Sequence, residues 1–202
     1  MKVLINCEFT GRVRDAFAAL GHDAWSCDYL PTESPGKHIQ ADFRSVVQDS
    51  WDFVGYHYEC RVMANSGVRW LYEKPGRWQE LDEAAEIFNL TLRDTRPGYS
   101  ENSQMHKHAV QRIDRPKDQI IQPWYHGDPF FKKTYLWLRD IPFLEDSNRL
   151  VPPKKGTEEY KKWSAVWYAS PGPERWKNRS RTFPGVAAAI ANQWSDIKRK
   201  AA

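Results

Sequence analysis

A glycine turn and acidic residues follow the first predicted strands of the chain, and residues of these types can bind a cofactor. Phe9 and Gly11 follow the apolar run 2–7, and Asp28 and Asp42 stand after the next two short apolar runs. A glycine lets the backbone approach a bound group, and a carboxylate after the second strand suits ribose hydroxyls. Alone, Gly11 is more typical of a tight turn, and Asp42 is also typical of a helix N-cap. Together these residues favour a cofactor site.

Basic residues gather beside an aromatic ring near the C-terminus. They are Arg175, Lys177, Arg179 and Arg181, which flank Trp176. Guanidinium and ammonium groups bind phosphates, and an aromatic ring stacks on a base. We therefore predict that this group binds nucleic acid. For the lysines at 132–133, 154–155 and 161–162, a solvated charged surface is the favoured interpretation.

The hydrophobic pattern predicts an α/β fold with a mostly parallel sheet flanked by helices. Strand 2–7, helix 14–20 and strand 23–27 follow one another with the spacing of a Rossmann-like unit. The later predicted elements are a short helix over 46–51, strand 51–57, helix 77–95, a strand-to-loop junction at 97–102, helix 106–113, strand 133–138 and helix 184–198. The segment 146–162 is rich in charge and proline, which predicts a mobile basic loop.

Length and composition set limits on the architecture. A chain of 202 residues, 41% of them hydrophobic, can bury one sizeable core, so we predict a single domain over 1–202. The net charge of +4 leans only mildly toward anionic partners. The three cysteines have no paired spacing, which argues against a disulfide framework and a zinc cluster.

Membrane and metal signals are both weak in this sequence. No apolar run approaches the roughly 20 residues that span a bilayer, and the N-terminus passes directly into a strand. We therefore predict a cytoplasmic protein with no membrane partner. His57, His106, His108 and His126 lack metal-ligand spacing to cysteines or carboxylates, so we expect surface histidines and no metal.

The order of these residues resembles that of the DNA cytosine-C5 methyltransferases. The similar pieces are Cys7-Glu8-Phe9-Thr10-Gly11-Arg12-Val13, Asp28, Asp42, the Cys60 loop and Glu101-Asn102. A short phage and prophage branch of that family is similar over nearly the whole chain, including Ala64-Asn65-Ser66-Gly67-Val68-Arg69-Trp70, Gln122-Pro123-Trp124, Thr134-Tyr135-Leu136-Trp137-Leu138, residues 170–176 and residues 179–185. Each piece is weak alone, but their joint order is specific.

The resemblance implies a fold, a cofactor and a partner. The fold is the Rossmann-like fold of S-adenosylmethionine-dependent methyltransferases. Its cofactor would be held by Phe9, Gly11, Asp28 and Asp42, and its partner would be DNA in the cytoplasm of a bacterial host. The family's large target-recognition domain has no counterpart, because only about 25 residues are available between 139 and 163.

The resemblance also implies a catalytic pair. Methylation at C5 of cytosine needs a thiolate that adds at C6. Cys60 stands where the family has Pro-Pro-Cys, and Glu101 stands where its Glu-Asn-Pro glutamate holds the flipped base. Here the motifs read Tyr58-Glu59-Cys60 and Glu101-Asn102-Ser103. Losing the two prolines predicts looser placement of the sulfur, and Glu59 adds negative charge beside the thiolate.

Three functions are consistent with these residues. The first is S-adenosylmethionine-dependent methylation of cytosine in DNA, with Cys60 as nucleophile and Glu101 orienting the base. The second is a catalytically inactive homologue with a buried, inert Cys60, used by a phage as a DNA-binding or anti-defence module with a host or phage protein as partner. The third is a modifying enzyme that acts on a free pyrimidine nucleotide or uses an altered cofactor, which follows from the missing recognition domain.

Overall fold

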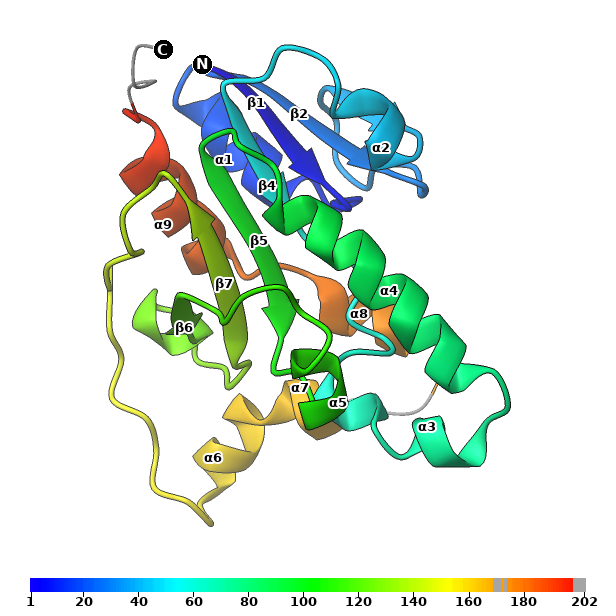
Figure 1. Ribbon diagram of the computed structural model, residues 1–202. Helices are drawn as coiled ribbons and strands as arrows, with labels where there is room; N and C mark the ends of the chain where they lie inside the picture. The colour runs from blue at the N-terminus through cyan, green and yellow to red at the C-terminus, as the bar shows by residue number, and fades with distance from the viewer. Residues whose placement is uncertain (169–171, 173, 198–202) are drawn as a thin grey trace.

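A single seven-stranded sheet organises the part of the chain that the computed structural model describes, residues 1–168, 172 and 174–197 (Figure 1). The strands are β1 (Lys2–Asn6), β2 (Asp23–Asp28), β3 (His38–Gln40), β4 (Phe53–Tyr56), β5 (Gly98–Ser103), β6 (Gln119–Ile121) and β7 (Thr134–Arg139). Their order in the sheet is β3-β2-β1-β4-β5-β7-β6. The first five of these run parallel, and β7 is antiparallel to both of its neighbours.

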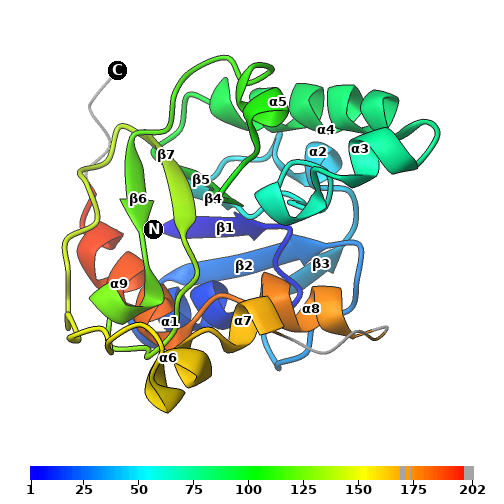
Figure 2. The same cartoon turned by 90° about the horizontal axis from the view of Figure 1, so that it is seen from below.

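Helices cover both faces of the sheet (Figure 2). On one face lie α1 (Arg12–Ala19) and α9 (Pro184–Trp194), and on the other lie α2 (Phe43–Val46), α4 (Arg77–Leu92) and α5 (Lys107–Val110). The remaining short elements are η1 (Asn65–Gly67), α3 (Trp70–Glu73), η2 (Pro123–Tyr125), α6 (Glu158–Trp163), α7 (Ala165–Tyr168) and α8 (Arg175–Ser180). The predicted α/β fold with a mostly parallel, helix-flanked sheet is confirmed.

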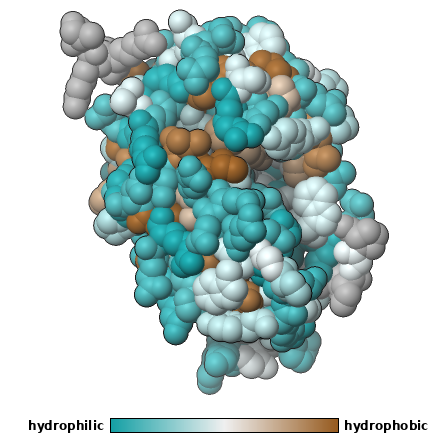
Figure 3. Space-filling view, turned by 45° about the vertical axis from the view of Figure 1, so that its right-hand side comes forward, coloured by the Kyte–Doolittle hydropathy of each residue, from teal (hydrophilic) through white to brown (hydrophobic). Residues whose placement is uncertain are grey.

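The core divides into clusters on the two faces of the sheet. Val3 and Ile5 pack in the cluster that includes α1 and α9, whereas Leu4 packs with Phe43 of α2. This division follows from the alternation of side chains along a strand. Outside the core, the face that carries α4 is mostly hydrophilic, with hydrophobic side chains in small separate patches (Figure 3). Among the described residues, no helix has both the length and the apolar character needed to cross a bilayer.

Local capping moves several helix boundaries from their predicted positions. The helix predicted over 46–51 lies instead at Phe43–Val46, because the Asp42 carboxylate accepts the Arg44 backbone N–H (2.9 Å) and begins the helix there. The helix predicted over 106–113 shortens to Lys107–Val110, with His106 as its cap. The last helix ends at Trp194, and position 198 of its predicted range lies outside the described residues.

The segment predicted as a basic loop over 146–162 is partly helical. Thr157 accepts the backbone N–H of Tyr160 (3.2 Å) and begins α6 at Glu158. The stretch before it is held along η2, because Asn148 N–H donates to Tyr125 O (3.2 Å) and Leu150 N–H donates to Trp124 O (2.9 Å). A single side chain of α6 is buried, which leaves no hydrophobic period for sequence to detect.

Candidate functional site

The ends of the central strands surround a cavity. From β1 the chain moves to β2 and β3 in one direction across the sheet, and from β4 to β5 in the other. In open parallel sheets, such a reversal leaves a crevice at the carboxyl ends of the strands, where ligands bind. A cavity of about 760 Å³ lies at this position. Its lining includes residues 7–10 after β1, residues 57–61 after β4 and part of α8.

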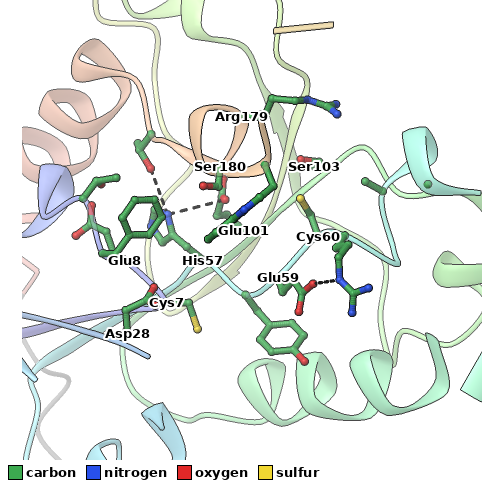
Figure 4. Close-up of a pocket in the computed structure, with 18 of the residues that line it drawn as sticks. Cys7, Glu8, Asp28, His57, Glu59, Cys60, Glu101, Ser103, Arg179 and Ser180 are labelled. Atoms are coloured by element: carbon green, nitrogen blue, oxygen red, sulfur yellow. Dashed lines mark hydrogen bonds and ion pairs between the residues drawn. The ribbon is translucent and has the colours of Figure 1, made fainter. Parts of the chain in front are cut away.

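Cys60 and Glu101 line this same cavity (Figure 4). Cys60 is half-buried at the start of a turn, where its carbonyl accepts the backbone N–H groups of Met63 (3.1 Å) and Ala64 (2.7 Å). The side-chain amide of Asn102 donates to the Tyr58 carbonyl on the other side of the loop (3.2 Å). These hydrogen bonds fix the backbone of the Tyr58-Glu59-Cys60 loop, which contains no proline.

The charge of Glu59 is paired beside the thiol. Its carboxylate accepts from Arg61 at 2.5 Å, and Arg61 also lies 3.1 Å from Glu80. The pairing offsets the repulsion that a free Glu59 carboxylate would exert on a Cys60 thiolate. Arg179 of α8 lines the cavity as well, and burial and the charge of Arg175 lower its pKa while Cys60 acts in the opposite direction.

Glu101 lies beside a buried histidine that the sequence pattern assigned to the surface. His57 Nδ1 is 3.9 Å from Glu101 Oε1 and 3.2 Å from Thr182 Oγ1, and its Nε2 is 2.7 Å from the Tyr99 hydroxyl. Burial lowers the pKa of His57, which favours the neutral imidazole. Within the described part of the chain the Glu101 carboxylate accepts no hydrogen bond, so it is available to a ligand.

The expectation of surface histidines is wrong at three of the four positions. His57 has 7% of its side chain exposed, and His106 and His126 are buried. His106 is buried because it caps α5 with Nδ1 and contacts the Val62 carbonyl with Nε2. The position of His57 at the end of β4, directly before the Cys60 loop, is the sequence signal that could have placed it at the cavity.

Two of the four predicted cofactor residues line the cavity. Phe9 and Asp28 do so, and Asp28 accepts the Leu30 backbone N–H at 2.9 Å. Burial raises the pKa of Asp28. Asp28 also acts on the neighbouring Cys7 thiol, whose pKa is raised well above its usual value by burial and then by the charge of Asp28. A ring face and a half-buried carboxylate suit an adenosyl group and its ribose.

Gly11 and Asp42 are placed in structural positions outside the cavity lining. Gly11 has φ +69°, and a Cβ there would lie 2.2 Å from a guanidinium nitrogen of Arg14, so glycine is required by the turn. Asp42 caps α2 and pairs with Arg44 at 2.5 Å, and it also accepts from the Tyr29 hydroxyl at 2.7 Å.

The predicted basic group on α8 divides into two sides. Lys177 and Arg181 pair with Glu33, at 3.5 Å and 2.8 Å, and both cations stand over the Phe9 ring. Arg175 and Arg179 instead line the cavity. The group is therefore not one continuous surface patch.

Only part of the predicted lysine surface reaches the cavity. Lys132 and Lys133 line it. Lys132 Nζ donates to the Arg181 carbonyl at 3.1 Å, close to the end of α8. The lysines of 154–155 and 161–162 do not line the cavity. Lys154, Lys155, Lys161 and Lys162 are exposed, as predicted for a solvated charged surface. Lys132 and Lys133 form a short basic rim next to α8.

The buried carboxyl of Glu8 should make stability depend on pH. Burial raises the pKa of Glu8 from 4.5 to about 7, although Val13 and Arg14 donate backbone N–H bonds to it. Because the folded chain holds this proton more tightly, the stabilisation is fully present below pH 4.5 and is lost as the pH rises through 7. At about 1.36 kcal/mol per pKa unit, the loss is on the order of 3 kcal/mol.

Urea unfolding of the wild type and of Glu8→Gln at pH 4.5 and pH 8 measures this contribution. The wild type should lose more unfolding free energy than Glu8→Gln between the two values. Glu158→Gln, at an exposed position, is the control and should follow the wild type. Parallel pH curves for the wild type and Glu8→Gln would contradict the assignment.

Releasing α8 from Glu33 should weaken binding at the Phe9 end of the cavity. Glu33→Gln removes the carboxylate that pairs with Lys177 and Arg181. Because the pair is partly exposed, we expect a threefold to fivefold loss of adenosyl-ligand affinity, below about 1 kcal/mol. Calorimetry with S-adenosylhomocysteine measures it. Glu158→Gln, which breaks an exposed pair with Lys161 elsewhere, is the matched control, and equal affinities for the two variants would refute the role of Glu33.

Neither metal ligation among the described residues nor comparison with known proteins assigns a further role to the cavity. Among the residues that the structure describes, no group of three or more His, Cys, Asp or Glu side chains is arranged to hold a metal ion. No protein-family model matches the chain, and no curated protein matches it.

Proposed function

We propose that this chain is a DNA cytosine-C5 methyltransferase that uses S-adenosylmethionine as methyl donor. The observation that carries the proposal is the shared cavity: the Cys60 thiol and the Glu101 carboxylate line it together with Phe9 and Asp28. A thiol nucleophile, a carboxylate for the base and a nucleoside-sized hollow are the groups that this reaction requires.

The residues of the chain have distinct roles in this proposal. The Cys60 thiolate forms a bond to C6 of cytosine, and the electron pair of the C5–C6 double bond becomes available at C5. Glu101 holds the N3 and amino edge of the base. When bound, the cofactor would supply the methyl group. Loss of the C5 proton to solvent and cleavage of the Sγ–C6 bond then restore the ring and the thiolate.

The end of the cavity with Phe9 and Asp28 supports the cofactor part of the proposal. Asp28 would accept hydrogen bonds from ribose hydroxyls, and Phe9 would pack on the adenosyl group. Glu33, through α8, would hold that end closed. Asp42, which the resemblance also assigned to the cofactor, is engaged by Arg44 and Tyr29 and has no part in this account.

Cofactor binding and methyl transfer test the proposal. The chain should bind S-adenosylmethionine in calorimetry and transfer a labelled methyl group to C5 of cytosine in DNA. Asp28→Asn should lower cofactor affinity about tenfold, because hydrogen bonds to a charged group contribute about 1.5–3 kcal/mol. Asp23→Asn, at the exposed opposite end of β2, is the matched control. Absence of cofactor binding by the wild type would refute the proposal.

One observation favours the inactive nucleic-acid-binding homologue as a second function. Arg175 and Arg179 line the cavity without carboxylate partners among the described residues, and this arrangement does not depend on a reactive Cys60. Cofactor and DNA binding without any methyl transfer would support this second function.

A further inference from the structure

Two arginines of α8 line the cavity and have no ion-pair partner among the described residues. Arg175 and Arg179 lie one helical turn apart, and both line the cavity. The Nε atom of each is buried and has no hydrogen-bond partner in the described part of the chain. Neither side chain forms an ion pair within residues 1–168, 172 and 174–197.

The other guanidinium groups of the cavity lining show that this state is unusual. Each pairs with a carboxylate: Arg44 with Asp42 at 2.5 Å, Arg61 with Glu59 at 2.5 Å and Arg77 with Glu80 at 2.6 Å. The neighbouring arginines therefore each have a carboxylate partner, whereas the pair on α8 has none among the described residues.

Leaving this pair unpartnered costs free energy. A half-buried cation without a counter-charge loses hydration that nothing replaces, and two like charges one turn apart repel. Burial lowers the pKa of Arg179, and the charge of Arg175 lowers it further. A ligand oxyanion between the two groups would relieve both penalties.

The neighbours of Arg179 indicate which part of a ligand carries that oxyanion. Arg179 lies on the side of the cavity that holds Ser103 and Cys60, away from Glu8 and Asp28 (Figure 4). Lys177 and Arg181 instead stand over Phe9. Arg179 therefore lies toward the base end of the cavity, and Arg175, one helical turn before it, lines the same cavity. An anion attached to the base-bearing ligand is a nucleotide phosphate, and paired guanidinium groups match its oxygens.

We propose that Arg175 and Arg179 bind the phosphate of the nucleotide whose base lies between Cys60 and Glu101. This inference rests on the proposed function for the position of the base. The phosphate comes from a mononucleotide or from a DNA strand, which share this chemistry. In either case the phosphate is bound inside the cavity. The segment 146–157 does not line the cavity, so nucleotide binding at this subsite does not require that segment.

Calorimetry with small phosphate-bearing ligands tests the subsite. The wild type should bind dCMP at least tenfold more tightly than deoxycytidine, and it should bind deoxyribose 5-phosphate. Arg175→Gln combined with Arg179→Gln should abolish both effects, whereas Arg175→Lys combined with Arg179→Lys should retain part of the dCMP preference. Lys155→Gln, which removes one exposed positive charge outside the cavity, should leave the preference unchanged.

A single-stranded oligonucleotide with one internal cytosine distinguishes the two sources of phosphate. If only the oligonucleotide binds and the double glutamine variant loses that binding, the subsite holds a backbone phosphate. The proposal is overturned if the wild type binds dCMP and deoxycytidine alike and the double variant binds the oligonucleotide as tightly as the wild type. Because none of these readouts uses methyl transfer, an inactive Cys60 would refute the proposed function without affecting the phosphate subsite.

Discussion

Replacing Cys60 with alanine should lower methyl transfer to cytosine by at least about 10³-fold while leaving S-adenosylmethionine affinity unchanged. Removal of a covalent nucleophile eliminates the reaction path that it opens, which is why such effects are large. The Cys60 side chain is half-buried in the cavity and forms no hydrogen bond with the described residues, so its removal should cost the fold little. Single-turnover transfer of a labelled methyl group measures the change.

The matched comparison for this variant is Glu101→Gln. Glutamine keeps the shape of the side chain but removes the carboxylate that would hold N3 of the base, and it should lower transfer while preserving cofactor affinity. A Cys60→Ala variant that transfers methyl groups as fast as the wild type would exclude the thiol as nucleophile. The cavity would then serve another chemistry.

Replacing Arg139 with methionine should lower the free energy of unfolding by about 2–4 kcal/mol, because each buried acceptor left without a donor costs about 1–3 kcal/mol. The Arg139 guanidinium donates to the carbonyls of Val54 (2.6 Å) and Thr91 (3.2 Å) and to Ser100 Oγ (3.0 Å). Burial lowers its pKa to about 10. Methionine fills similar volume but leaves these acceptors without a donor.

Urea unfolding measures this loss, with Arg93→Met as the matched control. Arg93 has 60% of its side chain exposed and pairs with Asp114 at the surface, so its replacement should cost less than about 1 kcal/mol. Equal losses for the two variants would contradict the structural role of Arg139. Because Arg139 connects β7 to β4 and β5, its loss should also disturb the strands that present His57 and Glu101.

The central strands and their helices followed from hydrophobic periodicity, whereas several short helices did not. β1, α1 and β2 alternate or repeat apolar residues over enough length to be detected. Helix α8 has no buried residue, and α6 buries only Trp163, so neither has a hydrophobic period. Such helices are stabilised by capping and by tertiary contacts. A pattern of apolar residues reveals neither of these.

The candidate site was partly predictable for a similar reason. Residues at the ends of parallel strands meet at one edge of the sheet, so the order of Phe9, Asp28, Cys60 and Glu101 anticipated their common cavity. Gly11 and Asp42 match the same motif but serve a turn and a cap, which are local roles that a motif does not separate from binding.

The division of α8 depends on a contact between distant parts of the chain. Glu33 lies more than 140 positions before the helix and forms ion pairs with Lys177 and Arg181. Arg175 and Arg179 line the cavity instead. The spacing of basic residues within 175–181 contains no information about that contact. The sequence therefore predicted a basic group but not its two sides.

Trapping on DNA that contains 5-fluorocytosine tests the central claim most directly. Fluorine at C5 cannot leave as a proton does, so a thiolate that has added at C6 remains attached after methyl transfer. Mass spectrometry of the digested complex should find the methylated fluorinated base on the peptide that contains Cys60, only when S-adenosylmethionine is present. Cofactor and DNA binding without an adduct, or an adduct on Cys7 or Cys27, would contradict the assignment of Cys60 as the nucleophile.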